Sequence, residues 1–300
     1  MQRYAGTSVA SQPMTLASPE IVRFVRAGLD HPEGLCFAAD GSLVCGSEAG
    51  AIYRIDPKTG SFETTAQTGG FVLGLCADRA GAVYACDAGR NEVLRIEPNG
   101  SVEAISTGRL DNPNDCAFDA AGNLFFTESG TYHPTRHSGR LFAITPEGET
   151  LCAHPGPFRF ANGVFVDHSN ALLYLVESTA PSILGFRIDG PQVASMEPVR
   201  QIPLEPGTVP DGVALDTEGN IYVAFYSPDQ IGVIRTDDRF EVLYRDPLAE
   251  WMNRPTNIAL RTDEIYFANL GGWHIGAVEH RLEPMLPFLP NQGPRRKSAS

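Results

Sequence analysis

The chain has 300 residues, of which 42% are hydrophobic and 20% are charged, and its formal net charge is -13 at pH 7. A chain of this length and composition can bury a large core, which suits either two average domains or one large domain built from repeats. The excess of acidic residues excludes nucleic acid as an expected partner, because binding to phosphates depends on clustered Lys and Arg.

The N-terminal stretch MQRYAGTSVASQPMTLASPE contains no apolar run long enough for the core of a secretory signal. No later window approaches the roughly 18 uninterrupted apolar residues of a membrane-spanning helix. We therefore expect a cytoplasmic protein without membrane contact, in which residues 1–17 form a flexible leader.

Six cysteines lie inside apolar stretches such as GLCFA and NDCAF, and none belongs to a CxxC pair. We expect them to be small core residues of a protein kept in a reducing compartment, with a disulfide as the alternative. The cysteines are Cys36, Cys45, Cys76, Cys86, Cys116 and Cys152.

One phrase recurs six times along the chain: a polar head, an apolar strand, a turn and a second strand. The copies are HPEGLCFAADGSLVCGSE, FVLGLCADRAGAVYACDA, NPNDCAFDAAGNLFFTES, FANGVFVDHSNALLYLVES, VPDGVALDTEGNIYVAFY and RPTNIALRTDEIYFANL. We call the head residue of each copy its marker, and the six markers are Glu33, Leu73, Asn114, Asn162, Asp211 and Thr256. Their spacings of 40, 41, 48, 49 and 45 residues, with strand-turn-strand content, are typical of β-propeller blades.

Turn residues support a hairpin in each copy, because a tight turn needs a residue that tolerates positive φ. Glycine lies eight residues after the marker in four copies, Asn170 takes this place in the fourth copy, and Asp263 takes it in the shorter sixth copy. The four glycines are Gly41, Gly81, Gly122 and Gly219. Between the copies, stretches such as EVLRIEPNGSVEAI supply the two outer strands of each four-stranded blade.

Six blades of about 45 residues account for about 270 residues of the chain. We therefore predict an all-β fold, a six-bladed β-propeller with a central metal site, as a single domain over residues 18–285. The segment EIVRFVRAG, residues 20–28, is expected to complete the last blade and close the ring. Residues 286–300, which end in NQGPRRKSAS, are expected to form a disordered tail.

The markers should converge on the axis of the ring, because the first strand of each blade lines the central channel. Four of them, Glu33, Asn114, Asn162 and Asp211, offer carboxylate and amide oxygens. This donor set favours Ca²⁺, with Mg²⁺, Mn²⁺ and Zn²⁺ as alternatives, and leaves coordination positions open for water or substrate. A purely structural role is the other interpretation, since Asn and Asp also bond nearby backbone at strand starts.

A second column of residues near the end of the second strand is also mostly polar. It consists of Ser47, Asp87, Glu128, Glu177, Phe225 and Asn269. These side chains are candidates to orient the metal ligands or to act as acid or base, whereas polar strand ends at a solvated rim are the simpler interpretation.

Substrate recognition is expected in the longer loops on the face that carries the markers, because loops on a rigid scaffold commonly bind ligands. The third copy contains the long loop ESGTYHPTRHSGR, residues 128–140, and the last two copies contain FYSPDQ and ANLGGWHIG. A structural role is the alternative for each histidine taken singly. The candidate substrate-binding residues are Asn112, Asn114, Glu128, Tyr132, His133, Tyr226, Trp273 and His274.

The phrases HPEGL, NPND, FANGV and PDGVALDTEGNIYVA resemble the metal-binding phrases of the gluconolactonase family, which includes senescence marker protein (regucalcin). The resemblance extends over residues 20–280 and implies a six-bladed propeller with a divalent cation on its axis that hydrolyses lactones, typically sugar lactones. It further implies that Glu33, Asn162 and Asp211 bind the metal and that Asn114 binds the metal or substrate. Two features depart from the family pattern, PEGL in place of GEGP and Asn112 in place of an arginine.

The expected reaction is metal-dependent opening of a lactone, with sugar (aldono) lactones as the expected substrates, in which the cation polarises the carbonyl and an activated water attacks. Asp211 is the candidate general base, with Glu128 or Glu177 as alternatives, and the absence of GxSxG leaves a serine nucleophile without support. The alternatives are a promiscuous esterase or organophosphate hydrolase of the paraoxonase type, and a non-catalytic, calcium-stabilised propeller that binds a ligand. The sequence leaves the oligomeric state open.

Overall fold

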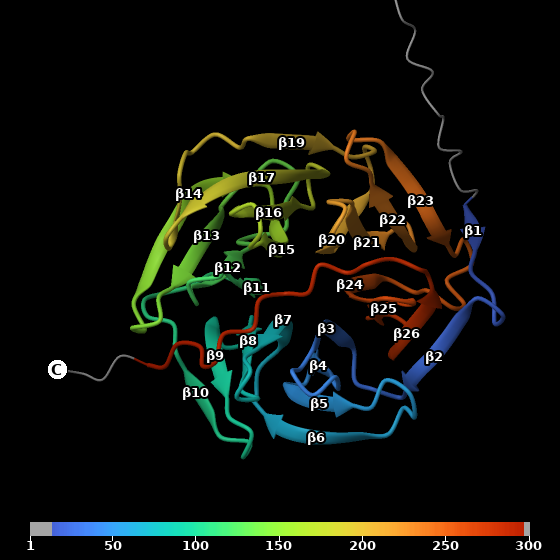
Figure 1. The fold of residues 1–300 in the computed structure, drawn as a ribbon, viewed down its shortest axis with the longest axis horizontal. Coiled ribbons are helices and arrows are strands. Elements are labelled where there is room, and N and C mark those ends of the chain that lie inside the picture. The colour runs from blue at the N-terminus through green and yellow to red at the C-terminus, as the bar shows by residue number, and fades with distance from the viewer. Residues whose placement is uncertain (1–13, 297–300) are drawn as a thin grey trace, which may run out of the picture.

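The computed structural model describes residues 14–296, which form six antiparallel sheets arranged as a ring (Figure 1). Each sheet runs from an innermost strand beside the axis to an outer strand at the rim. The all-β, six-bladed propeller predicted from the repeat is therefore confirmed.

The first three blades each contain four strands that are consecutive in the sequence. Blade 1 consists of β3 (Pro32–Phe37), β4 (Leu43–Ser47), β5 (Ala51–Ile55) and β6 (Phe62–Gln67). Blade 2 consists of β7 (Val72–Ala77), β8 (Val83–Asp87), β9 (Glu92–Ile96) and β10 (Val102–Ala104). Blade 3 consists of β11 (Pro113–Phe118), β12 (Leu124–Glu128), β13 (Gly139–Ile144) and β14 (Thr150–Phe158).

Blade 4 contains an additional short strand, and blades 5 and 6 each add a strand from the N-terminal part of the described chain. Blade 4 consists of β15 (Ala161–Asp167), β16 (Leu172–Glu177), β17 (Ser182–Asp189) and β19 (Arg200–Pro203), with the short β18 (Gln192–Val193) paired to the end of β17. Blade 5 consists of β20 (Val209–Leu215), β21 (Ile221–Ser227), β22 (Gln230–Ile234), β23 (Phe240–Arg245) and the parallel β1 (Thr15–Leu16). Blade 6 consists of β24 (Pro255–Arg261), β25 (Glu264–Asn269), β26 (His274–Glu279) and β2 (Val22–Ala27).

The N-terminal strand closes the ring, as the sequence predicted. β2 pairs antiparallel with β26, with Val22 opposite Val278 and Ala27 opposite His274. Each innermost strand contacts the innermost strands of both neighbouring blades, and β24 contacts β3. A strand from the start of the domain therefore joins the last blade, so that the ring has no open seam.

Neighbouring innermost strands approach each other closely at the residue after each marker. A Cβ atom added to Gly34 would lie 2.1 Å from the carbonyl oxygen of Leu73, and one added to Gly163 would lie 2.4 Å from that of Asp211. Only glycine fits such a close backbone approach. The third blade instead has Asp115 at this position, and the side chain of Asp115 is buried.

The turn prediction is correct at the four glycines and wrong in detail elsewhere. Gly41, Gly81, Gly122 and Gly219 all have positive φ, between 86° and 90°. In blade 4 the residue with positive φ is Ala171 rather than Asn170, because Asn170 uses its amide to donate a hydrogen bond to Asp167 Oδ2 at 2.8 Å. Asp263 does not have positive φ.

The six cysteines are free thiols, as expected. Four of them are buried, whereas Cys152 is exposed and so does not belong to the core. The Sγ atoms of Cys76 and Cys116, on the innermost strands of blades 2 and 3, lie 3.6 Å apart. The hydrophobic side chains pack between adjacent blades, where Phe125 of β12 and Leu173 of β16 share one cluster.

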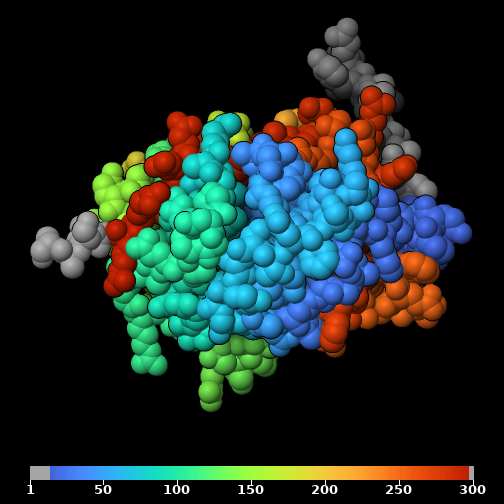
Figure 2. Space-filling model, turned by 90° about the horizontal axis from the view of Figure 1, so that it is seen from below, coloured from blue at the N-terminus to red at the C-terminus, as the bar shows by residue number. Residues whose placement is uncertain are grey.

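A C-terminal strap, residues 280–296, crosses one face of the ring (Figure 1, red). It bridges Pro284 to Asp216 in blade 5 and then donates from Gly293 N to Asp78 Oδ2 in blade 2, at 3.1 Å. Figure 2 shows the red strap at one face and green atoms of blade 3 projecting from the opposite face.

The terminal predictions fall partly on residues 1–13 and 297–300, which lie outside the described range. Where the leader is described, Thr15–Leu16 forms β1 rather than a free end. Where the tail is described, residues 286–296 follow a defined path along blades 2 and 5, so the prediction of disorder does not match them. Residues 14–296 contain no helix that is long and apolar enough to cross a membrane.

Candidate metal centre

The markers lie at the starts of the innermost strands, at the end of the axis away from the strap. The strap contacts the opposite ends of these strands, near Leu215 and Asp78. Three of the four predicted ligands are almost fully buried: Asn114 and Asn162 are 6% exposed and Asp211 is 7% exposed. The fold therefore brings together side chains that are up to 178 residues apart, since 211 minus 33 is 178.

We call the four predicted ligands, Glu33, Asn114, Asn162 and Asp211, the marker ring. Its two carboxylates lie in an environment that disfavours their negative charge. Burial is the main reason that the pKa of Glu33 rises to about 8. A hydrogen bond from Thr256 lowers this pKa, and the negative charge of Asp115 raises it further. Burial, followed by the charges of Glu33 and Asp115, raises the pKa of Asp211 well above its usual range. The Oε2 atom of Glu33 is buried and has no hydrogen-bond partner within residues 14–296.

The two amides leave their oxygens available. The Nδ2 of Asn162 donates to Ser178 Oγ at 3.0 Å, and that hydroxyl donates to the carbonyl of Pro210 at 2.7 Å. This relay fixes which end of the Asn162 amide is the nitrogen, so that its oxygen stays free. The Asn114 side chain makes no hydrogen bond to any other described residue.

Two hydroxyl groups, whose role the sequence does not reveal, hydrogen-bond to backbone carbonyls of the marker ring. Thr127 Oγ1 donates to the carbonyl of Asn162 at 2.7 Å, from blade 3 to blade 4. Thr256 Oγ1 donates to the carbonyl of Glu33 at 2.9 Å, from blade 6 to blade 1. These bonds cross blade boundaries, so no local sequence pattern reveals them.

Asp115 is the functional residue that sequence reasoning missed. It follows the marker Asn114 where four of the other five blades have glycine and blade 6 has Asn257, and this departure was the available signal. Its Oδ1 accepts from Cys116 N at 2.9 Å and its Oδ2 accepts from Val164 N at 3.0 Å. Burial is the main reason that its pKa rises to about 7. Asp115 thus adds negative charge beside the ring while both its oxygens are held by backbone.

These residues fit a hard divalent cation. Among the described residues, no group of three or more His, Cys, Asp or Glu side chains is arranged to hold a metal ion. A cation at this ring therefore depends on amide oxygens as well as on Glu33 and Asp211, which is the donor type that Ca²⁺ prefers. The orphaned Glu33 oxygen and the free amide of Asn114 are consistent with such a ligand.

The second column is a set of loop anchors. Four of its members accept a backbone N–H from the loop that precedes the innermost strand of the same blade. The pairs are Asp87 with Phe71 N at 2.9 Å, Glu128 with Asp111 N at 2.7 Å, Glu177 with Arg159 N at 2.8 Å and Asn269 with Asn253 N at 3.0 Å. These anchors are buried, so they are not the polar strand ends at a solvated rim of the simpler interpretation, and their hydrogen bonds hold the backbone of loops.

Glu128 and Glu177 are fully engaged in this role. Arg140 binds both oxygens of Glu128, at 2.5 Å and 2.9 Å, and Glu128 is 1% exposed. Glu177 receives a further hydrogen bond from Ser182 Oγ at 3.0 Å. These contacts give neither carboxylate a free oxygen for proton transfer or for substrate.

The predicted substrate-binding residues of blade 3 lie in loops on the marker face. Asn112 has φ of 62° and its Nδ2 lies 3.4 Å from the carbonyl oxygen of Gly130, so its side chain supports the loop. Tyr132 is 59% exposed and packs edge-on against Phe160. His133 Nδ1 accepts from the backbone of Thr135 and Arg136 at 3.1 Å, which closes the loop turn.

The predicted residues of blades 5 and 6 divide between a surface hollow and the interior. Trp273 is 50% exposed and borders a hollow of about 580 Å³, together with Phe71, Leu270, Arg254, His31 and Glu48. The Arg254 guanidinium lies over the ring of Tyr226, with 5.2 Å between the guanidinium carbon and the ring centre. His274 instead is 3% exposed and stacks on Phe24, with 4.1 Å between ring centres.

Comparison with known proteins identifies relatives over most of the chain. Residues 102–267, more than half of the chain, match the family described as SMP-30/Gluconolactonase/LRE-like region. The diisopropyl-fluorophosphatase of Loligo vulgaris is 30% identical over 220 residues, which cover 65% of this chain and 69% of the relative. Lactonase drp35 of Staphylococcus haemolyticus is 24% identical over 249 residues, with 76% and 75% covered.

A solved structure has the same fold at low sequence identity. The calcium-binding protein regucalcin of Agrobacterium tumefaciens superposes with a TM-score of 0.74 at 12% identity, covering 93% of this chain and 99% of that one. The family match and the geometry of the marker ring agree with the resemblance found in the sequence. This chain belongs to the SMP-30/gluconolactonase/LRE-like family.

Proposed function

We propose that this chain is a divalent-cation-dependent hydrolase that opens lactones, with sugar (aldono) lactones as the first substrate class to test. The observation that carries this proposal is the ring of Glu33, Asn114, Asn162 and Asp211, in which a buried carboxylate oxygen and an amide have no hydrogen-bond partner among residues 14–296. Relatives named lactonase and diisopropyl-fluorophosphatase support hydrolysis as the reaction type.

The four ring residues would hold one divalent cation, with Ca²⁺ favoured and Mg²⁺, Mn²⁺ or Zn²⁺ as alternatives. When bound, such a cation polarises a carbonyl or phosphoryl oxygen and stabilises negative charge that develops there. The chain's own contribution is positional. The Ser178 relay orients the Asn162 amide, Thr256 fixes the backbone of Glu33, and Asp115 supplies additional negative charge beside the ring.

Asp211 is our candidate for the general base that accepts the proton of the attacking water. It is a ring carboxylate without a bound arginine, whereas Glu128 and Glu177, the alternatives, are held by Arg140 and by backbone and hydroxyl donors. A base must reach the proton it abstracts, and only Asp211 and Glu33 bring a ring carboxylate to the axis.

The hollow beside Trp273 is the proposed place for the part of the substrate that does not react. Its wall combines the rings of Trp273 and Phe71 with the side chains of Arg254 and Glu48. Aromatic faces of this kind bind apolar groups and also stack on sugar rings. A phosphoryl ester is the second candidate substrate, which the similarity to the squid diisopropyl-fluorophosphatase favours.

All six cysteines are free thiols, which supports our proposal of a reducing, cytoplasmic location. Thiols in a secreted chain of this size would be expected to pair more often. Comparing thiol titration of freshly prepared protein with its reduced form tests this point directly.

The deciding experiment measures proton release by protein stripped with a chelator, with and without added Ca²⁺, Mn²⁺ or Zn²⁺. The substrates are aldono-1,4- and 1,5-lactones, alkyl lactones, an aryl ester and diisopropyl fluorophosphate. We expect a cation to restore turnover of a lactone. Loss of a residue that only supports a metal ligand lowers activity by up to roughly 100-fold. Glu33→Gln should lower the cation-restored turnover by more than this. Glu63→Gln, on an exposed outer strand, should leave the restored turnover unchanged.

Three other outcomes redirect the proposal. Turnover of the fluorophosphate alone would replace lactones with phosphoryl esters as the substrate class. Tight cation binding without turnover of any substrate would identify a non-catalytic, metal-stabilised propeller. Lactone turnover that survives both the chelator and Glu33→Gln would remove the marker ring from the reaction.

A further inference from the structure

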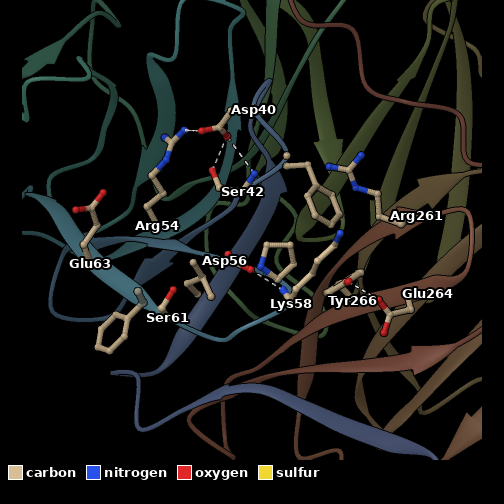
Figure 3. A pocket seen from close by; sticks show the side chains of 15 residues that line it. Asp40, Ser42, Arg54, Asp56, Lys58, Ser61, Glu63, Arg261, Glu264 and Tyr266 are labelled. Carbon is tan, nitrogen blue, oxygen red and sulfur yellow. Dashed lines mark hydrogen bonds and ion pairs between the residues drawn. The ribbon is translucent and has the colours of Figure 1, made fainter.

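A second hollow, of about 820 Å³, lies between blades 1 and 6 on the face opposite the marker ring (Figure 3). It is bordered by the β3–β4 turn, the β5–β6 turn and the ends of β24 and β25. None of the ring residues or the residues around Trp273 borders it. Whatever this hollow binds therefore does not share the proposed site of hydrolysis.

Two cations in this hollow have no acidic partner among residues 14–296. Arg261, at the end of β24, places its guanidinium 3.8 Å from the ring centre of Phe37, and neither a hydrogen bond nor an ion pair engages its nitrogens. Lys58, in the β5–β6 turn, likewise makes no side-chain ion pair. In Figure 3 both side chains extend toward the same part of the hollow.

The acids of the hollow are mostly engaged elsewhere. Asp40 binds Arg54 at 2.5 Å, Asp56 accepts the backbone N–H of Lys58 at 2.8 Å, and Glu264 binds Arg23 at 2.6 Å. Glu63 has no such partner among residues 14–296, but Figure 3 places it at the far end of the hollow from Arg261. The Asp56 carboxylate offsets part of the Lys58 charge, whereas the Arg261 guanidinium has no ion pair with any described residue, on a chain whose net charge is -13.

The chemistry of this end matches an oxyanion. A guanidinium offers paired N–H groups that suit phosphate or carboxylate oxygens, and an ammonium adds a point charge. Stacking on Phe37 holds the Arg261 plane in place, which limits the entropy lost when a ligand binds. Phe37 and Tyr266 also give the hollow an aromatic wall, and their rings meet edge-on with 5.2 Å between centres.

We propose that the hollow between blades 1 and 6 is a binding site for a small molecule with a phosphate group, in which Arg261 and Lys58 hold the phosphate and Phe37 and Tyr266 contact the rest. This site is separate from the marker ring, and the proposal does not depend on lactone hydrolysis. Binding should weaken with ionic strength because the two cations border an open hollow.

Titration calorimetry of the full chain with phenyl phosphate, orthophosphate and benzoate tests the proposal. We expect phenyl phosphate to bind more tightly than orthophosphate because of the aromatic wall, and to compete with it. Arg261→Gln and Lys58→Gln should each weaken phenyl phosphate binding by about tenfold or more, as expected for loss of a charged hydrogen bond. Arg187→Gln, which removes an exposed arginine of blade 4, is the matched control and should change nothing.

Arg261→Lys separates recognition from simple charge. This variant keeps the positive charge but loses the paired donors, so it should bind phosphate more weakly than the unaltered chain and more tightly than Arg261→Gln. Tighter binding of benzoate than of phenyl phosphate would replace phosphate with carboxylate and overturn the ligand class. Equal binding by the unaltered chain, Arg261→Gln and Arg187→Gln would overturn the site.

Discussion

At the scale of single residues, the marker ring depends on side chains that never touch the proposed cation. Asn162 presents its oxygen because its nitrogen is committed to Ser178, which is in turn committed to the carbonyl of Pro210. Supporting groups of this kind set the orientation of metal ligands and strongly affect metal affinity. Ser178, which follows Glu177 of the second column, is therefore a positioning residue for the proposed metal site.

Ser178→Ala should weaken cation binding without removing any ligand. The amide of Asn162 would lose its acceptor, so that the amide could rotate and present either end to the axis. We expect calcium affinity, measured by titration calorimetry, to fall by roughly 10- to 100-fold, and the free energy of unfolding to fall by about 1 kcal/mol. Ser169→Ala, at an exposed turn of the same blade, should have neither effect. Unchanged affinity in Ser178→Ala would show that the relay does not orient Asn162.

At the scale of elements, four of the six loops that enter an innermost strand are tied to the neighbouring second strand. In blade 6 this anchor consists of two side chains and the backbone groups that they bind. Asn269 Oδ1 accepts from Asn253 N, Asn269 Nδ2 donates to His274 Nε2 at 2.6 Å, and His274 Nδ1 donates to the carbonyl of Gly272 at 2.9 Å. These roles require a neutral imidazole, because Nε2 must accept.

His274 and His280 should therefore contribute stability that is lost in mild acid. Glu33, Asp115 and Asp211, whose pKa values burial raises, contribute in the opposite direction. Burial lowers the pKa of His274, and burial also lowers the pKa of His280. Below the unfolded value of about 6.5 the unfolded chain binds more protons than the folded chain, so stability present above that pH is lost as the pH falls toward the depressed folded value. Urea unfolding between pH 7 and pH 5 measures the net slope. Relative to the unaltered chain, His274→Gln should gain stability at pH 5 compared with pH 7, and adding His280→Gln should extend this change. An unaltered slope in His274→Gln would contradict the assignment.

The blades were predictable because their determinants are local and repeated. The markers and the apolar strands recur in every copy, the turn glycines recur in four of the six, and strand β2 stands out as an unpaired strand before the first copy. The ring residues followed from the geometry of a propeller. The sequence did not reveal Asp115 or the inter-blade hydroxyl bonds, because each depends on a neighbour that is distant in sequence. It did not reveal the burial of His274 either, because the ring of His274 packs against Phe24 from the start of the domain.

At the scale of the whole molecule, the strap links blades that the ring order keeps apart. Leu282 N donates to the carbonyl of Thr262 in blade 6, Met285 N donates to that of Leu215 in blade 5, and Arg79 N of blade 2 donates to the carbonyl of Pro290. Between these contacts, residues 285–289 cover a cavity on the axis. The composition of the strap, rich in proline and without a repeat, gave no signal of this path. Its order comes from the finished ring.

The end of the strap is fixed by a buried polar cluster. Asp78 is 0% exposed and Arg95 is 1% exposed, and Asp78 Oδ2 accepts from both Tyr84 Oη, at 3.0 Å, and Gly293 N, at 3.1 Å. Arg95 also binds Tyr84 and contacts the carbonyl of Gly293. A buried cluster of this kind is stable only when every member keeps its partner.

Gly293→Leu should therefore release the strap and expose the axial cavity. A Cβ atom at this position would lie 2.6 Å from the Tyr84 hydroxyl and 2.7 Å from Phe118 Cζ, and both groups belong to the packed interior. Overpacking of this type costs about 1–3 kcal/mol of unfolding free energy, which denaturant unfolding measures. Cys36, Cys76 and Cys116 border the cavity beneath the strap, so they should react faster with a thiol reagent in Gly293→Leu. Gln292→Leu, one residue earlier and exposed, should match the unaltered chain in both measurements. If both variants have the same stability and the same thiol reactivity, the contacts of Gly293 do not hold the strap in place. The two halves of the ring would then be joined by the contacts between blades alone.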